Sequence, residues 1–166
     1  MEEVAMQEVP TRVVSYAGFW KRFVAYLIDA ILLCIVSMVL FVPLLSMIGL
    51  GALGNMLQDE SDPSAGYIFA LVGTYMVTIV AIFVAGWLYY ALMESSSKGA
   101  TLGKMALGLR VTDLQGNNIS FGRATGRYFG KILSGLILYV GFLMAGFTQQ
   151  KQALHDILSG CLVVNK

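Results

Sequence analysis

The chain has 166 residues, of which 57% are hydrophobic and only 13% charged, and its formal net charge is +1. Soluble domains carry roughly a quarter of their residues charged, so this composition excludes an ordinary soluble domain and favours the lipid bilayer. The apolar residues are pooled into three long charge-free runs, and a run of about 18 or more such residues is a candidate membrane span. The runs lie between Asp29 and Asp59, between Asp62 and Glu94, and between Lys131 and Lys151.

These runs predict an all-α membrane protein with two transmembrane helices and a third apolar segment, and no separate soluble domain. Residues 1–14 mix acids, bases and Pro10 without an apolar period, which predicts a disordered tail ahead of a single membrane domain over residues 15–166. The first run is too long for a cleaved signal sequence, so we expect its helix to be retained. Neither a CxxC motif nor a paired-histidine spacing is present, and we expect no metal and no cofactor.

The first helix is predicted over residues 19–48, with aromatic and basic side chains anchoring its start at a membrane surface. Residues 49–66 read as a loop, since they combine three acids with several glycines. The second helix is predicted over residues 67–93, and Glu94 should mark the return to water.

The loop after the second helix is the most basic part of the chain. Between Lys98 and Lys131 it holds six bases and one acid, Asp113. Cytoplasmic loops are enriched in Lys and Arg, so we expect this loop and the N-terminus inside the cell and the acidic loop outside, in a bacterial inner membrane.

Within the basic loop, residues 109–112 and 119–121 flank a cluster of turn formers, which predicts a short cytoplasmic β-hairpin. Residues 160–164 form a similar short β-branched run and are expected to pair as a strand with residues 108–112, because an isolated hairpin is marginal.

Arg123, Arg127 and Lys131 recur at every fourth residue, so they should share one helix face that can lie along anionic lipid headgroups. Two interpretations stay open: the stripe only fixes topology, or it binds lipid.

The third run also allows two interpretations. Its length of about 19 residues would just cross a hydrocarbon core of about 30 Å. A glycine in its middle and the basic residues after it instead favour a re-entrant hairpin or a bent pair of short helices that returns the C-terminus to the cytoplasmic face.

Asp29 is at least one turn into the apolar region, two helical turns beyond Arg22. An ionisable residue there is costly unless it faces a partner or a water-filled cavity, so it either handles ions or protons or locks helix packing.

His155 is the single histidine and precedes Asp156, and it can act as a proton relay or as an interfacial residue with satisfied hydrogen bonds. No nucleophilic triad can be assembled around one histidine, so we expect no enzyme.

Four motifs carry a family resemblance: TLGK at 101–104, GLRV at 108–111, QALHD at 152–156 and GCLVV at 160–164. Together with Arg22 and Asp29 they resemble the RDD family of small membrane proteins, which is named for one Arg and two Asp that correspond here to Arg22, Asp29 and Asp156. The resemblance covers nearly the whole chain after the tail, with Cys161 as a small departure. It implies that the three residues converge on an ion or proton site, with His155, Lys104 and Arg110 in supporting positions.

Some members of that family are proposed to be cation/proton exchangers and others act as components of membrane complexes. If the three residues converge, two carboxylates near one guanidinium can alternate between holding a proton and holding a cation. The leading hypothesis is therefore a small transporter or transporter-like subunit for a monovalent cation, working as a homo-oligomer because three short segments can hardly enclose a polar pathway. The alternative is a scaffold or accessory subunit in which the charges are structural and the partners are lipids or a larger membrane complex. Neither hypothesis involves nucleic acid.

Overall fold

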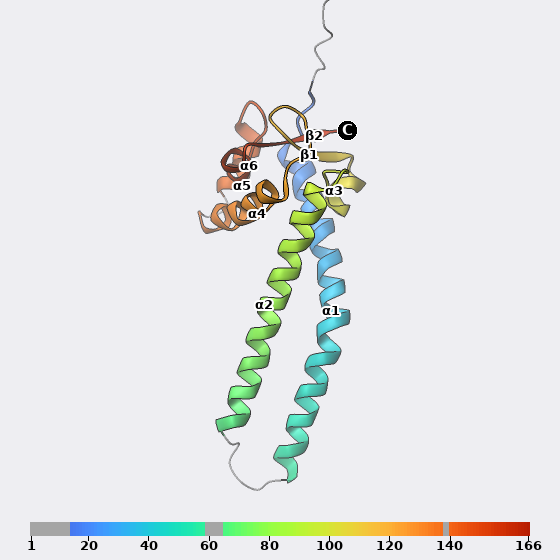
Figure 1. Cartoon of the computed structure of the whole chain (residues 1–166), viewed down its shortest axis with the longest axis vertical. Helices are drawn as coiled ribbons and strands as arrows, with labels where there is room; N and C mark the ends of the chain where they lie inside the picture. Colours follow the sequence, from blue (N-terminus) through green and yellow to red (C-terminus); the bar gives the residue numbers. More distant parts are fainter. Residues whose placement is uncertain (1–13, 59–64, 138–139) are drawn as a thin grey trace, which may run out of the picture.

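A computed structural model of the chain describes residues 14–58, 65–137 and 140–166 (Figure 1). Two long helices, α1 (Phe19–Gln58) and α2 (Ala65–Ser95), run side by side. The other elements gather at the end where α1 begins and α2 ends, and we call them the head: α3 (Leu102–Ala106), β1 (Leu109–Asp113), α4 (Phe121–Leu136), α5 (Val140–Phe147), α6 (Leu154–Ser159) and β2 (Cys161–Asn165).

Both long helices can cross a membrane. Their apolar parts, Phe19–Gly51 and Leu71–Ser95, have mean hydropathies of 2.8 and 2.1 over 18-residue windows. Helix α1 continues through Pro43 and ends ten residues later than predicted, so the expectation of a loop over residues 49–58 was wrong. The glycines there suggested a break, but the surrounding Leu, Met and Ala residues are strong helix formers. The acidic residues Asp59, Glu60 and Asp62, like the predicted tail at residues 1–13, lie outside the described residues.

The head contains a two-stranded antiparallel sheet in which Val111 of β1 faces Val163 of β2. This confirms the predicted pairing of residues 160–164 with residues 108–112. The predicted hairpin was wrong, because Ile119 is not in a strand and Phe121 begins α4. Ser120 caps that helix, and its Oγ accepts a hydrogen bond from the backbone N–H of Arg123 at 3.3 Å.

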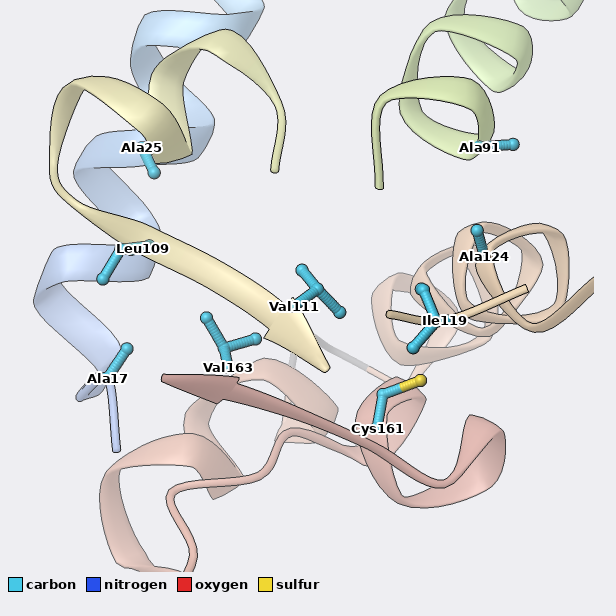
Figure 2. Close-up of a cluster of buried hydrophobic side chains, with 9 residues drawn as sticks. All are labelled: Ala17, Ala25, Ala91, Leu109, Val111, Ile119, Ala124, Cys161 and Val163. Atoms are coloured by element: carbon cyan, nitrogen blue, oxygen red, sulfur yellow. The ribbon is translucent and has the colours of Figure 1, made fainter. Parts of the chain in front are cut away.

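The start of α1 is attached to the last strand. The backbone N–H of Ala17 donates to the carbonyl of Val163 at 2.9 Å, and that of Asn165 donates to the carbonyl of Ser15 at 2.8 Å. Buried apolar side chains from α1, α2, α4, both strands and the segments beside them form one cluster around the sheet (Figure 2). The C-terminus therefore lies at the same end of the molecule as the start of α1, as the bent interpretation of the third run required.

The third apolar run is a bent pair. Helices α4 and α5 meet at 104°, and by length and composition the pair could also form one broken span. Helix α6 begins at Leu154. It is capped by Gly160, whose φ of 60° is the left-handed conformation that glycine adopts without strain.

Candidate functional site

Three carboxylates are buried where the long helices enter the head. Asp29 of α1 and Asp156 of α6 are both 0% exposed, and Glu94 of α2 is 1% exposed. Burying a charge is expensive unless it is paired and hydrogen-bonded, so the partners of each group determine what it can do.

Asp156 joins three elements. Its Oδ2 accepts hydrogen bonds from Nη1 of Arg22 in α1 and from the backbone N–H of Ala153 at 3.1 Å. Its Oδ1 accepts from Nε of Arg127 in α4 at 2.7 Å. Burial would raise the pKa of Asp156, but Arg127 and Arg22 hold it far below its usual range, so the group is ionised at neutral pH.

Glu94 is the partner of three basic residues. Its Oε1 accepts from Nζ of Lys104 and lies 3.5 Å from Nζ of Lys131. Its Oε2 lies 2.8 Å from Nη1 of Arg127, which therefore bridges Glu94 and Asp156. We call the six residues the ion-pair network: Arg22, Glu94, Lys104, Arg127, Lys131 and Asp156.

Asp29 has its own hydrogen-bond donors, none of which belongs to the ion-pair network. Its Oδ1 accepts from the hydroxyl of Tyr89 at 2.8 Å and from the backbone N–H of Gly103 at 2.7 Å, and its Oδ2 accepts from the hydroxyl of Thr101 at 2.6 Å. These three donors are neutral, and none of the ion pairs recorded for the described residues includes Asp29.

Two members of the predicted triad are therefore joined and Asp29 has other hydrogen-bond partners, while the role of the three residues as an ion or proton site stays a prediction. Arg22 and Asp156 meet directly, whereas Asp29 holds the start of α3 against α1. Helix α3 packs closely on α1 at this point, since a Cβ on Gly103 would lie 2.1 Å from the carbonyl oxygen of Ala25.

The three residues expected to support the site, Lys104, His155 and Arg110, have different surroundings. Lys104 lies in the ion-pair network, and burial together with Arg127 lowers its pKa to about 7 against the opposing effect of Glu94. Burial likewise lowers the pKa of His155 to about 3, although Asp156 opposes the shift. Arg110 lies outside the network, because its Nη2 donates to Asn118 at 2.6 Å.

The basic stripe does not lie on lipid headgroups as a unit. Arg127 is 2% exposed and fully paired, which contradicts its expected position on a lipid-facing surface. Lys131 lies over the ring of Tyr90, 4.2 Å from the ring centroid. Arg123 alone of the three is exposed, with 51% of its side chain accessible. Arg127 and Lys131 instead face buried carboxylates, since Glu94 of α2 pairs with both and Asp156 of α6 pairs with Arg127.

A cavity of about 1040 Å³ lies between α1, α2, α4 and α5. Its walls are mostly aliphatic and aromatic side chains of the two long helices, and its lining includes Asp29, His155 and four basic residues of the ion-pair network: Arg22, Lys104, Arg127 and Lys131.

Glu94, Tyr89 and Thr101 are the site residues that the sequence reasoning missed. Glu94 was interpreted as a mark of the water interface, but it is 1% exposed. The sequence does contain a sign of this role for Glu94. The loop that follows it has six bases and one acid, and any of those bases that become buried need a carboxylate from another part of the chain.

Comparison with known proteins agrees with this architecture. A model described as the RDD family matches residues 16–160. The chain is 39% identical over 151 residues to the Bacillus subtilis (strain 168) protein named "Uncharacterized protein YxaI", covering 90% of this chain and 97% of that one. It is 28% identical over 166 residues to "Uncharacterized membrane protein YteJ" of the same organism, covering 96% of this chain and 87% of that one. No solved structure gives a significant match.

Proposed function

Because the chain belongs to the RDD family, we propose that it is a non-enzymatic accessory or scaffold subunit of the membrane, in which the buried charges hold the head onto the two long helices. One observation carries this proposal. All six oxygens of Asp29, Glu94 and Asp156 already accept a hydrogen bond or an ion pair from the protein itself.

Cation exchange requires a carboxylate that releases its protein partners and accepts a cation in their place. Breaking a buried ion pair costs about 3–5 kcal/mol when one partner is removed. Glu94 and Asp156 would each have to give up pairs with at least two basic residues, and those bases would repel the incoming cation. The arrangement therefore suits a fixed joint between elements better than an exchange site.

A specific observation favours a second candidate, exchange of a monovalent cation for a proton at Asp29. This carboxylate lines the cavity and has neutral donors, and if the hydroxyl hydrogens of Tyr89 and Thr101 turn away from it, the two hydroxyl oxygens can serve as cation ligands.

Reconstituted liposomes with a pH-sensitive dye inside and different salts outside distinguish the two candidates. We expect no proton flux above that of protein-free liposomes under any salt or pH gradient. A salt-dependent flux that Asp29→Asn abolishes, with the variant folded and inserted at wild-type abundance, would overturn the scaffold proposal in favour of exchange.

A scaffold role also predicts assembly, either with further copies of the chain or with a larger membrane complex. The monomer mass is 18.0 kDa, so mild detergent extraction should give a species of higher protein mass. A monomer in detergents that preserve other complexes of the same membrane would count against the proposal.

We further propose an inner-membrane location with the head and the N-terminus in the cytoplasm, supported by the six bases between Lys98 and Lys131. In a background lacking Cys34 and Cys161, Glu60→Cys should be labelled by an impermeant thiol reagent from outside, and Lys166→Cys only after the membrane is permeabilised. Labelling of position 60 from the cytoplasmic side alone would reverse the orientation.

A further inference from the structure

The cavity between the long helices combines an apolar wall with a basic floor. The part of the wall that α1 supplies includes Phe23, Tyr26, Ala30, Leu33, Ser37 and Leu40. Steps of three and four residues place these side chains on one helix face, and from Arg22 to Leu40 that face extends over about 27 Å at 1.5 Å per residue. Helix α2 adds Ile79, Ile82, Phe83 and Gly86 from its own apolar span.

The floor has an excess of positive charge. Arg22, Lys104, Arg127 and Lys131 line the cavity, and among the described lining residues Asp29 is the one carboxylate. Glu94 and Asp156 do not line the cavity but pair with these bases. When they are included, the group contains four basic and three acidic side chains. With Lys104 protonated, the buried residues as a group carry one uncompensated positive charge, and an anion bound in the cavity favours that protonated form.

An unused donor lies in the same place. Nη2 of Arg22 is buried and has no hydrogen-bond partner among the described residues, although Nη1 and Nε of the same guanidinium are bonded to Asp156 and to the carbonyl of Ala17. A buried donor without a partner costs free energy, which an anionic oxygen at this point of the floor would remove.

We propose that this cavity binds one anionic phospholipid of the surrounding membrane. Its phosphodiester takes the place next to Arg22 and Lys131, and an acyl chain lies along the wall between α1 and α2. The single negative charge of a phosphodiester matches the single excess positive charge of the buried groups. A soluble anion would leave the long apolar wall without an occupant, and a wholly apolar ligand would leave the charge and the Arg22 donor unmatched.

Two pairs of variants test the proposal on the full chain. Lys131→Gln removes a basic residue from the floor but leaves Glu94 with Arg127 and Lys104, and its matched control is Arg123→Gln, the same charge change at an exposed site on the same helix. Gly135→Leu fills the cavity, because a Cβ there meets nothing within 4 Å and Gly135 lines the space. Its control is Gly126→Leu, in the same helix, equally unobstructed and outside the lining.

Each protein is purified in detergent, exposed to phosphatidylglycerol or phosphatidylcholine, and examined by native mass spectrometry. We expect the wild-type chain and both controls to retain a single phosphatidylglycerol and not phosphatidylcholine. Retention should fall about tenfold in Lys131→Gln, the size of one lost hydrogen bond to a charged group, and more in Gly135→Leu.

Equal retention in all five proteins, or equal loss in Lys131→Gln and Arg123→Gln, would overturn the proposal, because either result indicates lipid on the outer surface. Retention of phosphatidylcholine as strongly as phosphatidylglycerol would overturn the assigned role of the basic floor. If Gly135→Leu dissociates an oligomer without changing lipid content, the occupant is a second copy of the chain and the proposal fails. Should Gly135→Leu not fold, the Lys131 and Arg123 pair decides alone.

Discussion

Arg127 and Asp156 are joined twice, since Nε and Nη2 of the arginine each lie 2.7 Å from Oδ1 of the aspartate. The two side chains are 2% and 0% exposed, so this contact fixes α6 on α4 without access to water. The other arm of the same guanidinium reaches Glu94 and connects both helices to α2. One side chain of α4 thus joins α6 to the long helix α2, and this arrangement predicts which substitutions the fold tolerates.

Arg127→Leu should be the most damaging single change in the head. The change removes a positive charge that pairs with the buried carboxylates of Asp156 and Glu94. Breaking a buried ion pair typically costs about 3–5 kcal/mol. Chemical or thermal unfolding in detergent micelles measures the loss. The control Arg123→Leu, at an exposed position, should change stability by less than about 0.5 kcal/mol. Equal stability of the two variants would contradict the role assigned to Arg127.

Arg22 should be coupled to Asp156 and not to Asp29. Because Arg22 and Asp156 are in contact, the double variant Arg22→Ala with Asp156→Asn should be more stable than the sum of the single losses by about 0.5–3 kcal/mol. Arg22→Ala with Asp29→Asn should be additive, since Asp29 has a separate set of donors. Double-mutant cycles measured by unfolding decide this, and coupling of Arg22 to Asp29 would restore the triad that the sequence suggested.

Gly103→Ala should detach α3 from α1. The new Cβ would lie 2.1 Å from the carbonyl oxygen of Ala25 and 3.0 Å from Asp29, so backbone must move and the hydrogen bond from Gly103 to Asp29 is lost. Overpacking costs about 1–3 kcal/mol even where side chains can adjust, and more is expected here. Gly126→Ala, which meets nothing within 4 Å, is the matched control and should not lower the unfolding midpoint.

Acidification should destabilise the head through His155. Burial lowers its folded pKa to about 3 from an unfolded value near 6.5, so the unfolded chain binds a proton first as the pH falls. The stabilisation is complete above pH 6.5 and decreases between 6.5 and 3, by about 2 kcal/mol at pH 5. Asp156, Arg127, Lys131 and Lys104 are the charged groups that act on this ring, and protonation of Asp156 adds a further loss below its unfolded pKa of 3.8.

Unfolding midpoints at pH 7.5 and pH 5 measure this effect in the wild type and in His155→Gln. The variant lacks the titrating ring, so its midpoint should fall less over the same interval. An identical fall in the two proteins would assign the acid sensitivity to other groups.

The sequence determined the elements whose signal is local. Long charge-free runs predicted α1 and α2, and the β-branched residues after Gly108 and Gly160 predicted the pairing of β1 with β2. The position of Gly160 at the end of α6 also followed from local backbone preference. Helix ends were less certain, because the glycines after residue 48 weaken a helix without ending it when strong helix formers surround them.

The partners of the charged residues were decided by the tertiary structure. The sequence identified Arg22, Asp29 and Asp156 as unusual, and one of the expected contacts, Arg22 with Asp156, is present across 134 residues of chain. It could not show that Asp29 binds Gly103 and Thr101 or that Glu94 turns inward to Arg127, because each of those contacts depends on how α3 and α4 fold back onto the long helices. Composition determines which segments enter the bilayer, because the free energy of transferring a segment from water into lipid depends on the residues of that segment alone. The pairing of buried charges depends on several segments meeting at once, and it therefore exists only in the assembled fold.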